Sequence, residues 1–375
     1  MSDRLTSLPT ELLDRVCDYV CYPRVPAALA LVCRAFVPSV RSRRFKDVHI
    51  CNSPSLKKLC ELFDVTPAAA AHVNTLKIAR EWSDRHHSTV ADFDSRVVQL
   101  FQRMTRVHTL EITRTRRYAD LLVSAPLDPP LLPSLEILSL TNCFDSWTTP
   151  FDLERLRGLE RFPELYHLEL RTSPRPTPAP APQQQPTGAI KQRWLWDVYL
   201  EGSLTGETGA SELIAALPSL RTLSLLDNSD GEQDPGDLLS QVQFPHLLEE
   251  LGLNCNLEPT STRLAALLPT FVNLKVLAAN NLFGPSFLPV LSLLPSLREL
   301  KLYPGCDVTA EEVCGLFNGP NACSALESLL LGVSDLEQDE WERIVDLAEA
   351  RHVELKGKAV ERARRSRQER LGLAV

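Results

Sequence analysis

The sequence contains no apolar run long enough to cross a membrane and no pattern typical of a signal peptide. A span needs about 18 uninterrupted apolar residues. The first residues, MSDRLTSLPTE, carry charge and proline where a signal peptide needs an apolar run. The N-x-S/T pattern of glycosylation sites is also absent. We therefore expect no membrane partner and a location in the cytoplasm, the nucleus or both.

The cysteines lack the spacing of disulfide frameworks and zinc sites. Ten cysteines are scattered along the chain, with no C-x-x-C pair and no paired Cys/His spacing. This pattern predicts reduced thiols that pack as small apolar side chains. We therefore predict no metal site and no cofactor.

Sequence patterns of enzymes are missing as well. The glycines of GETGAS (206–211) lack the rest of a phosphate-binding loop, and SDGEQDPGD (229–237) lacks the spacing of a calcium loop. His86 and His87 have no ligand partner at helical spacing. We predict no catalytic residues and a protein that is not an enzyme.

Negative charge is concentrated in the middle of the chain. The formal net charge of −8 divides into +3 for residues 1–50, −16 for 51–355 and +5 for 356–375. Because nucleic-acid binding depends mainly on Lys and Arg that neutralise phosphates, the acidic middle argues against a nucleic-acid partner. The basic end is expected to be a solvated helix or disordered, or alternatively a nuclear-import or acidic-partner patch.

The sequence does contain one phrase that recurs through most of the chain. Its clearest copies are LPSLEILSL (132–140), LPSLRTLSL (217–225) and LPSLRELKL (294–302). Eleven copies lie 23 to 34 residues apart, with the second aliphatic residue at 76, 110, 138, 168, 198, 223, 251, 277, 300, 329 and 353. Such even self-similarity predicts a repeat array.

The phrase L-x-x-L-x-L predicts a short parallel strand whose inward leucines stack on those of the next repeat. Between the copies lie helix-like stretches at 53–63, 92–104, 209–217, 261–268, 309–317 and 334–350. Thr309 and Glu312 have the spacing of a capping box. The pattern resembles the leucine-rich-repeat family, which implies an α/β fold: a horseshoe-shaped solenoid with parallel strands inside and helices outside.

In that family an Asn or Cys after the strand binds free backbone groups of the turn. Cys143, Asn228 and Asn256 occupy this position here. The corresponding residues of three other copies do not fit, so their turns are expected to be irregular: Leu282, Gly305 and Ser334.

One connection between repeats is rich in proline. Six prolines fall between 174 and 186, which excludes a helix and favours polyproline II or disorder. We interpret 173–193 as a loop leaving the solenoid. A proline-motif ligand or a phosphorylatable loop is the alternative.

The N-terminal residues do not carry the repeat. LPTELLDRVCDYV (8–20), VPAALALVCRAF (25–36) and VPSVRSRRF (37–45) predict three short helices, the first with an apolar stripe. So short a segment buries too little surface to be stable alone. The stripe therefore needs a partner, which is either the first repeat or another protein.

This segment resembles an F-box, through LPxELLxxVxxYV followed by ALALVCRAF and a basic turn. Phe36 stands where many members have Trp, and Val25-Pro26-Ala27 replaces the acidic residue that often opens the second helix. The resemblance implies binding to the Skp-type adaptor of a cullin-RING ubiquitin ligase. The implied contact residues are Leu8, Pro9, Leu12, Leu13, Val16, Val32, Cys33 and Phe36.

The sequence thus predicts three parts: an F-box-like helical domain (1–47), a solenoid of about 11 repeats (48–355) and a basic tail (356–375). The resemblance implies a substrate-recognition subunit of an SCF-type ligase, in which partner subunits carry out ubiquitin transfer. The alternative is a leucine-rich scaffold without a ligase role, with the N-terminal helices as its cap.

Residues that alternate with the inward leucines should face the concave surface, where a client protein would bind. Two neighbouring copies provide an acidic, tyrosine-bearing patch suited to a basic or extended segment of an unknown client. The patch comprises His167, Glu169, Arg171, Asp197, Tyr199 and Glu201.

Overall fold

The fold was examined in a computed structural model of the 375-residue chain. The structure describes residues 12, 37–51, 53–79, 90–114, 122, 131–143, 157–171, 195–201, 208–226, 235–257, 262–282, 287–306, 308–320, 322–332 and 336–370. The chain divides into two units, residues 1–143 with 158–165, and residues 144–157 with 166–375. Each unit is described by itself below.

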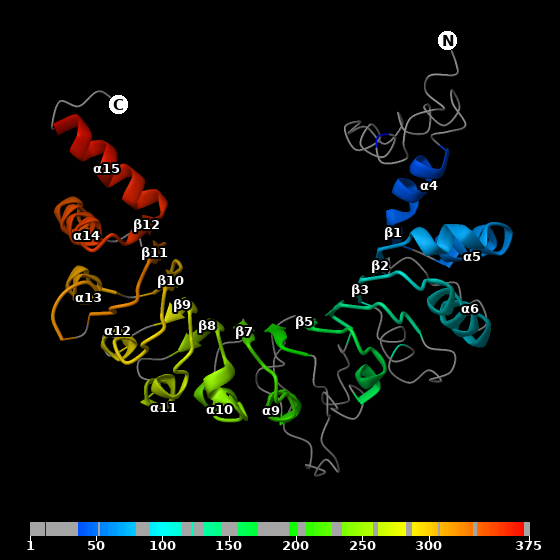
Figure 1. The fold of residues 1–375 in the computed structure, drawn as a ribbon, viewed down its shortest axis with the longest axis horizontal. Coiled ribbons are helices and arrows are strands. Elements are labelled where there is room, and N and C mark those ends of the chain that lie inside the picture. The colour runs from blue at the N-terminus through cyan, green and yellow to red at the C-terminus, as the bar shows by residue number, and fades with distance from the viewer. Residues whose placement is uncertain are drawn as a thin grey trace. The chain divides into compact units, whose positions relative to one another are not determined.

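Strands and helices alternate along the chain (Figure 1). The strands are β1 (Asp47–Ile50), β2 (Thr75–Ala79), β3 (Thr109–Thr113), β4 (Ile137–Thr141), β5 (His167–Arg171), β6 (Asp197–Glu201), β7 (Thr222–Leu226), β8 (Glu250–Leu257), β9 (Val276–Leu282), β10 (Glu299–Leu302), β11 (Ser328–Leu331) and β12 (Glu354–Lys356). The α-helices are α4 (Val37–Lys46), α5 (Ser53–Val65), α6 (Val90–Arg103), α9 (Thr208–Ala215), α10 (Pro235–Leu239), α11 (Thr262–Leu267), α12 (Phe287–Leu291), α13 (Ala310–Gly315), α14 (Gln338–Ala350) and α15 (Lys358–Arg370). Short 3₁₀ helices are η2 (Pro67–His72), η3 (Arg157–Arg161), η5 (Pro245–Leu247) and η6 (Leu268–Thr270).

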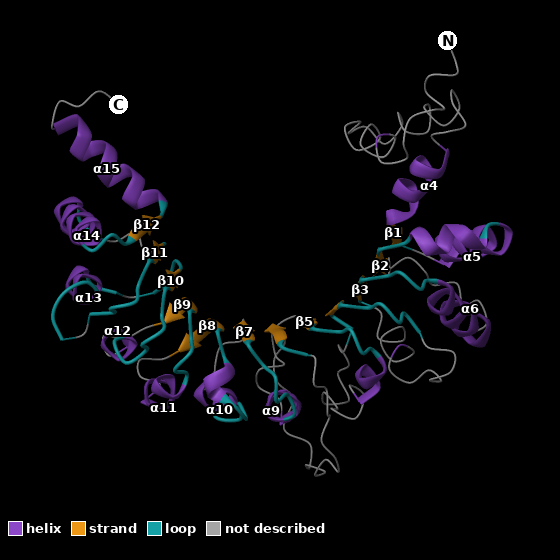
Figure 2. Ribbon diagram, viewed as in Figure 1, coloured by secondary structure: helices purple, strands orange, loops and turns teal. Residues whose placement is uncertain are grey.

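In the first unit, strands β1 to β4 pair in chain order and in parallel. The register places Leu76 beside Leu110 and Leu110 beside Leu138, and all three side chains are fully buried. Helices α5 and α6 lie on one side of these strands (Figure 2). One repeat alone leaves its leucines uncovered, so each depends on its neighbours for burial.

The second unit repeats the same arrangement from β5 to β12, again in parallel and in chain order. Leu168, Val198, Leu223, Leu251, Leu277, Leu300, Leu329 and Leu355 form one buried stack across these strands. Parallel strands joined by helical crossovers, with aliphatic side chains facing the helices, are what the recurring phrase predicts. That prediction is confirmed.

The predicted elements match the described ones closely, with two differences in the strands. Asp47–Ile50 forms a further strand ahead of the first counted copy of the phrase. In the last copy the residue in register with Leu329 is Leu355, so the predicted position 353 is wrong by two residues. The capping box of α13 is confirmed, because Thr309 Oγ1 accepts from the Glu312 amide at 3.2 Å and Glu312 Oε2 accepts from the Thr309 amide at 2.8 Å.

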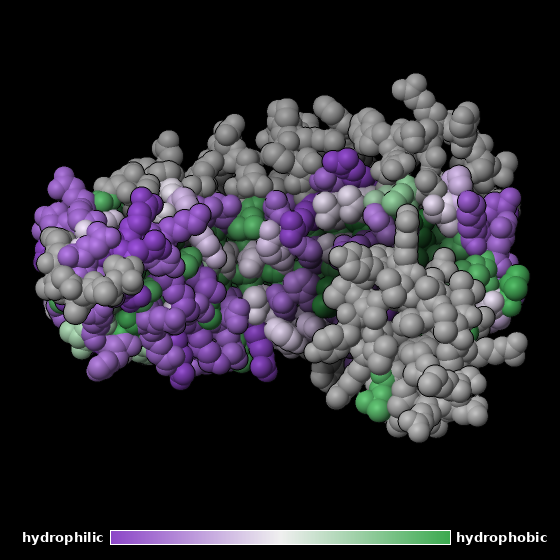
Figure 3. Space-filling view, turned by 90° about the horizontal axis from the view of Figure 1, so that it is seen from above, coloured by the Kyte–Doolittle hydropathy of each residue, from purple (hydrophilic) through white to green (hydrophobic). Residues whose placement is uncertain are grey.

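The basic end of the chain carries a helix, one of the two states predicted for it. Val360 and Ala363 of α15 are buried. Arg367 forms ion pairs with Asp346 (2.9 Å) and Glu349 (3.3 Å) of α14. Hydrophilic residues dominate this end of the second unit in the space-filling view (Figure 3).

Candidate functional site

Each strand in the middle of the repeats has one buried face and one exposed face. In β5, β6 and β7 buried residues alternate with partly exposed ones along all five positions. We call the strand face turned away from the helices and the buried leucines the open face. All six residues predicted to bind the client lie on it, in β5 and β6.

The register brings these six residues together in three pairs across the two strands. His167 lies beside Asp197, Glu169 beside Tyr199, and Arg171 beside Glu201. Neighbouring parallel strands are about 4.8 Å apart, so each pair is in direct side-chain reach. The predicted patch is therefore a single cluster within the second unit.

His167 and Asp197 form the first pair of the cluster. His167 Nδ1 lies 2.6 Å from Asp197 Oδ2. This hydrogen bond raises the pKa of His167 above its ordinary value, against the opposing effect of burial, and the charges of Asp197 and Glu169 act in the same direction as the hydrogen bond. The proton on the imidazole is thereby coupled to the Asp197 carboxylate.

Arg171 holds the rest of the cluster together. Its Nε donates to Glu169 Oε1 at 2.6 Å, and its guanidinium lies 3.5 Å from Glu201 Oε2. The guanidinium carbon also lies 4.8 Å from the centre of the Tyr199 ring, a cation–π distance. The Arg171 guanidinium thus contacts two carboxylates and one aromatic ring.

Tyr199 completes the network by donating from its hydroxyl to Glu201 Oε2 at 3.0 Å. Burial, followed by this hydrogen bond to a carboxylate, raises the pKa of Tyr199 to about 12. The phenol is therefore neutral at physiological pH. The sequence predicted an acidic, tyrosine-bearing patch, and the structure shows that Glu169, Asp197 and Glu201 are all bound to neighbours within it.

An aromatic pair beside the cluster escaped the sequence analysis. The rings of Tyr166 and Trp196 stack with centroids 5.2 Å apart, and 37% of Trp196 is exposed. Each residue stands one position before the first residue of its strand, so equal offsets in neighbouring copies could have revealed the pair. The stack extends the cluster with an apolar surface at the start of β5 and β6.

Two cysteines help to hold the turns after the strands. Cys143 Sγ donates to the Ile112 carbonyl at 3.1 Å, as expected for its position in the phrase. Cys306 Sγ donates to the Ala279 carbonyl at 3.4 Å, one residue beyond the position that Gly305 occupies. Asn228 lies outside the described residues, as do the side chains of Asn256 and Leu282.

The adaptor-binding residues predicted from the F-box resemblance fall almost entirely outside the described residues. Leu12 is the exception: it is helical and 43% exposed. The other seven lie outside: Leu8, Pro9, Leu13, Val16, Val32, Cys33 and Phe36. The first described helix after them is α4, in the segment 37–45 where the third helix was predicted.

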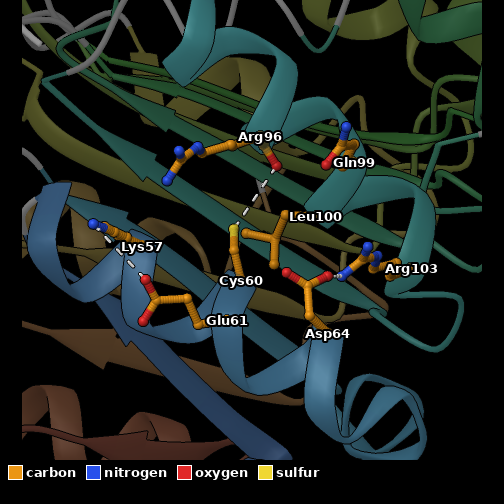
Figure 4. Close-up of a pocket in the computed structure, with 8 residues that line it drawn as sticks. All are labelled: Lys57, Cys60, Glu61, Asp64, Arg96, Gln99, Leu100 and Arg103. Carbon is orange, nitrogen blue, oxygen red and sulfur yellow. Dashed lines mark hydrogen bonds and ion pairs between the residues drawn. The ribbon is translucent and has the colours of Figure 1, made fainter.

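The first unit contains a cavity of about 270 Å³ between α5 and α6. Figure 4 shows Asp64 reaching Arg103 and Cys60 pointing toward the Arg96 carbonyl. Burial raises the pKa of the Cys60 thiol, which keeps it protonated and poorly nucleophilic. The cavity lies between helices of adjacent repeats and is lined mostly by polar side chains.

The cysteines, possible metal ligands and helix lengths of the described residues bear on metal binding and membrane insertion. The six cysteines whose side chains are described are free thiols, and no group of three or more His, Cys, Asp or Glu side chains converges as metal ligands among the described residues. None of the helices in the described ranges is long and apolar enough to cross a membrane.

The stacked leucines, the parallel register and the crossover helices decide the fold of the described chain. It is a leucine-rich-repeat solenoid. The buried side of each repeat follows L-x-x-L-x-L, and the open face carries the residues between the leucines. This is the α/β class that the repeat predicted.

Comparisons with known proteins were made at the level of families, sequences and structures. No family model matches the chain, and no curated protein matches it. Among solved structures, TLR13 in its complex with ssRNA13 is 14% identical with a TM-score of 0.43, over 75% of this chain and 36% of that one. The chain thus spans about a third of the TLR13 chain.

Two bacterial structures are also similar, and one of them is a leucine-rich-repeat-containing protein. LegL7 of Legionella pneumophila is 13% identical with a TM-score of 0.46, over 88% of this chain and 98% of that one. Internalin C2 of Listeria monocytogenes is 16% identical with a TM-score of 0.30, over 70% of this chain and 84% of that one. The register and the buried leucines of the chain itself carry the fold, independently of these similarities.

Proposed function

We propose that this chain is the client-binding subunit of an SCF-type cullin-RING ubiquitin ligase. The observation that carries the proposal is the order of the two segments. An F-box-like phrase at 8–36 is followed at once by a leucine-rich-repeat solenoid with an open, polar strand face. In this role the N-terminal segment binds a Skp-type adaptor, the open face binds a client, and partner subunits transfer ubiquitin.

The open face supports the client-binding half of the proposal. In β5 and β6 its side chains are fixed by hydrogen bonds and an ion-pair network before any client arrives. A surface fixed in advance loses less side-chain entropy on binding than one whose long polar residues move freely. The exposed Leu12 side chain supports the adaptor-binding half, because it leaves an apolar group available on the first predicted helix.

Direct binding to purified Skp adaptor tests the ligase role. We expect the full chain to retain the adaptor, and Leu12→Asp with Val16→Asp to lose it, because charges at an apolar interface centre each reduce affinity strongly. Leu293→Asp is the matched control, since Leu293 is 57% exposed in the second unit and the same charge there should leave adaptor binding intact.

The scaffold alternative predicts the opposite result. A leucine-rich scaffold whose N-terminal helices cap the solenoid shows no adaptor complex in the wild type, or it unfolds when Leu12 and Val16 are replaced. Far-ultraviolet circular dichroism of the double variant distinguishes lost binding from lost folding. The open face alone also fits a scaffold, so the adaptor experiment decides between the two roles.

Client binding through the open face is tested separately. Alanine at Glu169, Tyr199 and Glu201 together removes both acceptors and the ring that hold Arg171. We expect this variant to lose crosslinked proteins that co-purify with the wild type from its native cells, while adaptor binding persists. Unchanged co-purification would remove the open face of β5 and β6 as the client site.

A further inference from the structure

Charge is unevenly distributed along the open face of the second unit. From β5 to β8 the face carries four carboxylates, those of Glu169, Asp197, Glu201 and Glu250, against the one permanent cation of Arg171. In β10 and β12 the charges balance, because Glu299 pairs with Lys301 (3.4 Å) and Glu354 with Lys356 (3.0 Å). The excess of negative charge is therefore confined to β5–β8.

Glu250 differs from the other three carboxylates. They bind His167, Arg171 or Tyr199, whereas the exposed Glu250 carboxylate has no partner among the residues that the structure describes. Its neighbours in register are Thr222 on β7 and Val276 on β9, and neither is charged. Glu250 is thus the carboxylate of this face that is available to an incoming cation.

The adjacent residue provides a contrast. Glu249 stands one position before the strand and lies 2.5 Å from Lys275 and 3.8 Å from Arg221. Its negative charge is compensated by both neighbouring repeats. Two consecutive glutamates in the chain are therefore electrostatically different, which makes Glu249 a matched control for Glu250.

The surroundings of Glu250 admit an extended chain close to the strands. On β8 the next residue of the open face is Gly252, which lies between Ser224 and Ala278 in register. Asn280 on β9 adds a buried amide oxygen without a hydrogen-bond donor. Toward β6 the face carries Tyr199, whose ring already contacts Arg171, and Trp196 stands beside the start of the strand. Trp196 is 37% exposed and offers an apolar surface on which the stem of a lysine or arginine can lie.

We propose that the open face of β5–β8 binds an extended, basic segment of a client protein, with an arginine or lysine of that segment on Glu250. The inference rests on the proposed client-binding role of the open face and names the chemistry of the client. Charge complementarity supplies the selectivity, since the uncompensated carboxylate gains a partner only when a cation arrives.

The test uses the full chain and dye-labelled twelve-residue Gly/Ser peptides with a central Arg-Arg pair. Peptides with citrulline in place of arginine keep the shape and remove the charge. We expect the arginine peptide to bind, and the citrulline peptide and the Glu250→Gln variant each to weaken binding about tenfold, the effect of one charge-assisted hydrogen bond. Glu249→Gln changes net charge equally and should leave affinity unchanged.

A second pair of variants tests the same contact without replacing Glu250. Val276→Lys places a cation beside Glu250 in register and should compete with the peptide, whereas Val276→Leu should not. Binding that is absent, that is equal for arginine and citrulline, or that falls equally with Glu249→Gln overturns the proposal.

Comparison with the co-purified clients separates this inference from the proposed function. If the Glu169, Tyr199 and Glu201 alanine variant loses clients while Glu250→Gln retains them, the open face binds clients and the basic segment is wrong. If neither variant loses clients, the open face itself is not the client site. Adaptor binding is measured in parallel and is independent of both results.

Discussion

At the scale of single residues, the His167–Asp197 pair makes folding depend on pH. The hydrogen bond that the His167 imidazole donates to the Asp197 carboxylate holds the pKa of His167 above its ordinary value of 6.5 in the folded chain. The stabilisation is therefore fully present below pH 6.5 and is lost as pH rises through the raised pKa.

We expect the wild type to lose stability relative to His167→Gln as the pH rises above 6.5 and through the raised pKa of His167. Urea unfolding at a series of pH values measures the difference. Asp197→Asn should reduce the same pH dependence, because the imidazolium then loses its charged partner and only the Glu169 charge remains to raise its pKa. Parallel stability curves for wild type and His167→Gln would contradict this prediction.

Gly357, which follows β12, has a backbone conformation that favours glycine. Its φ of +135° lies in the region that favours glycine, and an added Cβ would lie 2.3 Å from the Leu331 carbonyl oxygen. We expect Gly357→Ala to lower the free energy of unfolding by about 2–4 kcal/mol through strain and steric overlap.

Gly315→Ala is the control for this substitution. Gly315 lies in α13, and a Cβ there meets nothing within 4 Å. Alanine should stabilise the helix by up to about 1 kcal/mol, because glycine loses more backbone entropy on folding. Chemical denaturation of both variants checks the contrast, and equal effects would show that Gly357 is not strained.

At the scale of single residues the sequence predicted which side chains share a strand face, but not which of them pair with one another. Alternation with the leucines correctly placed His167, Glu169 and Arg171 on one face, because period two is a property of the strand itself. It did not reveal that Arg171 binds both Glu169 and Glu201, because such pairing depends on side-chain rotamers and on the register of the next strand. That the Glu250 carboxylate lacks a partner among the described residues can be recognised only once these pairs are known.

At the scale of elements, the capping box predicted from the sequence is present at the start of α13. Thr309 and Glu312 satisfy each other's backbone amides at the start of the helix. We expect Thr309→Ala to cost about 1 kcal/mol of stability, and Thr309→Ser to restore most of it. Thermal or urea unfolding measures both, and an unchanged Thr309→Ala stability would show that the cap contributes nothing.

The two strands that were misplaced or missed from the sequence, β12 and β1, carry the least complete copies of the recurring phrase. RHVEL at the end of the array offers Val353 and Leu355, which share a strand face, so two registers fit equally well. Pairing with β11 selects Leu355. Strand β1 was not counted because DVHI lacks the preceding leucine of the phrase, and only its pairing with β2 identifies it.

Long amphipathic helices were predicted well for the opposite reason. The stretches at 53–63 and 92–104 carry several turns of apolar periodicity, and α5 and α6 cover them. The turn position of Cys306 was missed because residues 303–305 lengthen the connection by one residue, which shifts the sulfur relative to the phrase.

At the scale of the whole molecule, stability should depend on where in the array a repeat is damaged. Each repeat of the second unit buries its leucines only against its two neighbours, so the unit behaves approximately as a one-dimensional chain of coupled elements. Leu300 in β10 has a neighbour on each side, whereas Leu355 in β12 pairs only with β11.

We expect Leu300→Ala to cost about 3–5 kcal/mol and to raise amide exchange in several repeats on both sides. Leu355→Ala should raise exchange mainly in β11, β12 and α15. Hydrogen–deuterium exchange with peptide resolution distinguishes the two patterns. Uniform exchange increases in both variants would mean that the unit unfolds as one cooperative block.

Helix α15, which follows the last strand β12, affects whether another chain can pair with the edge of that strand. Strand β12 has a hydrogen-bonded neighbour on one side only, and α15 packs against it and against α14. An exposed edge strand has unpaired backbone groups with which a strand of another chain can pair, and such pairing can lead to aggregation. With α15 lying against β12, strand addition by another chain is hindered at this edge.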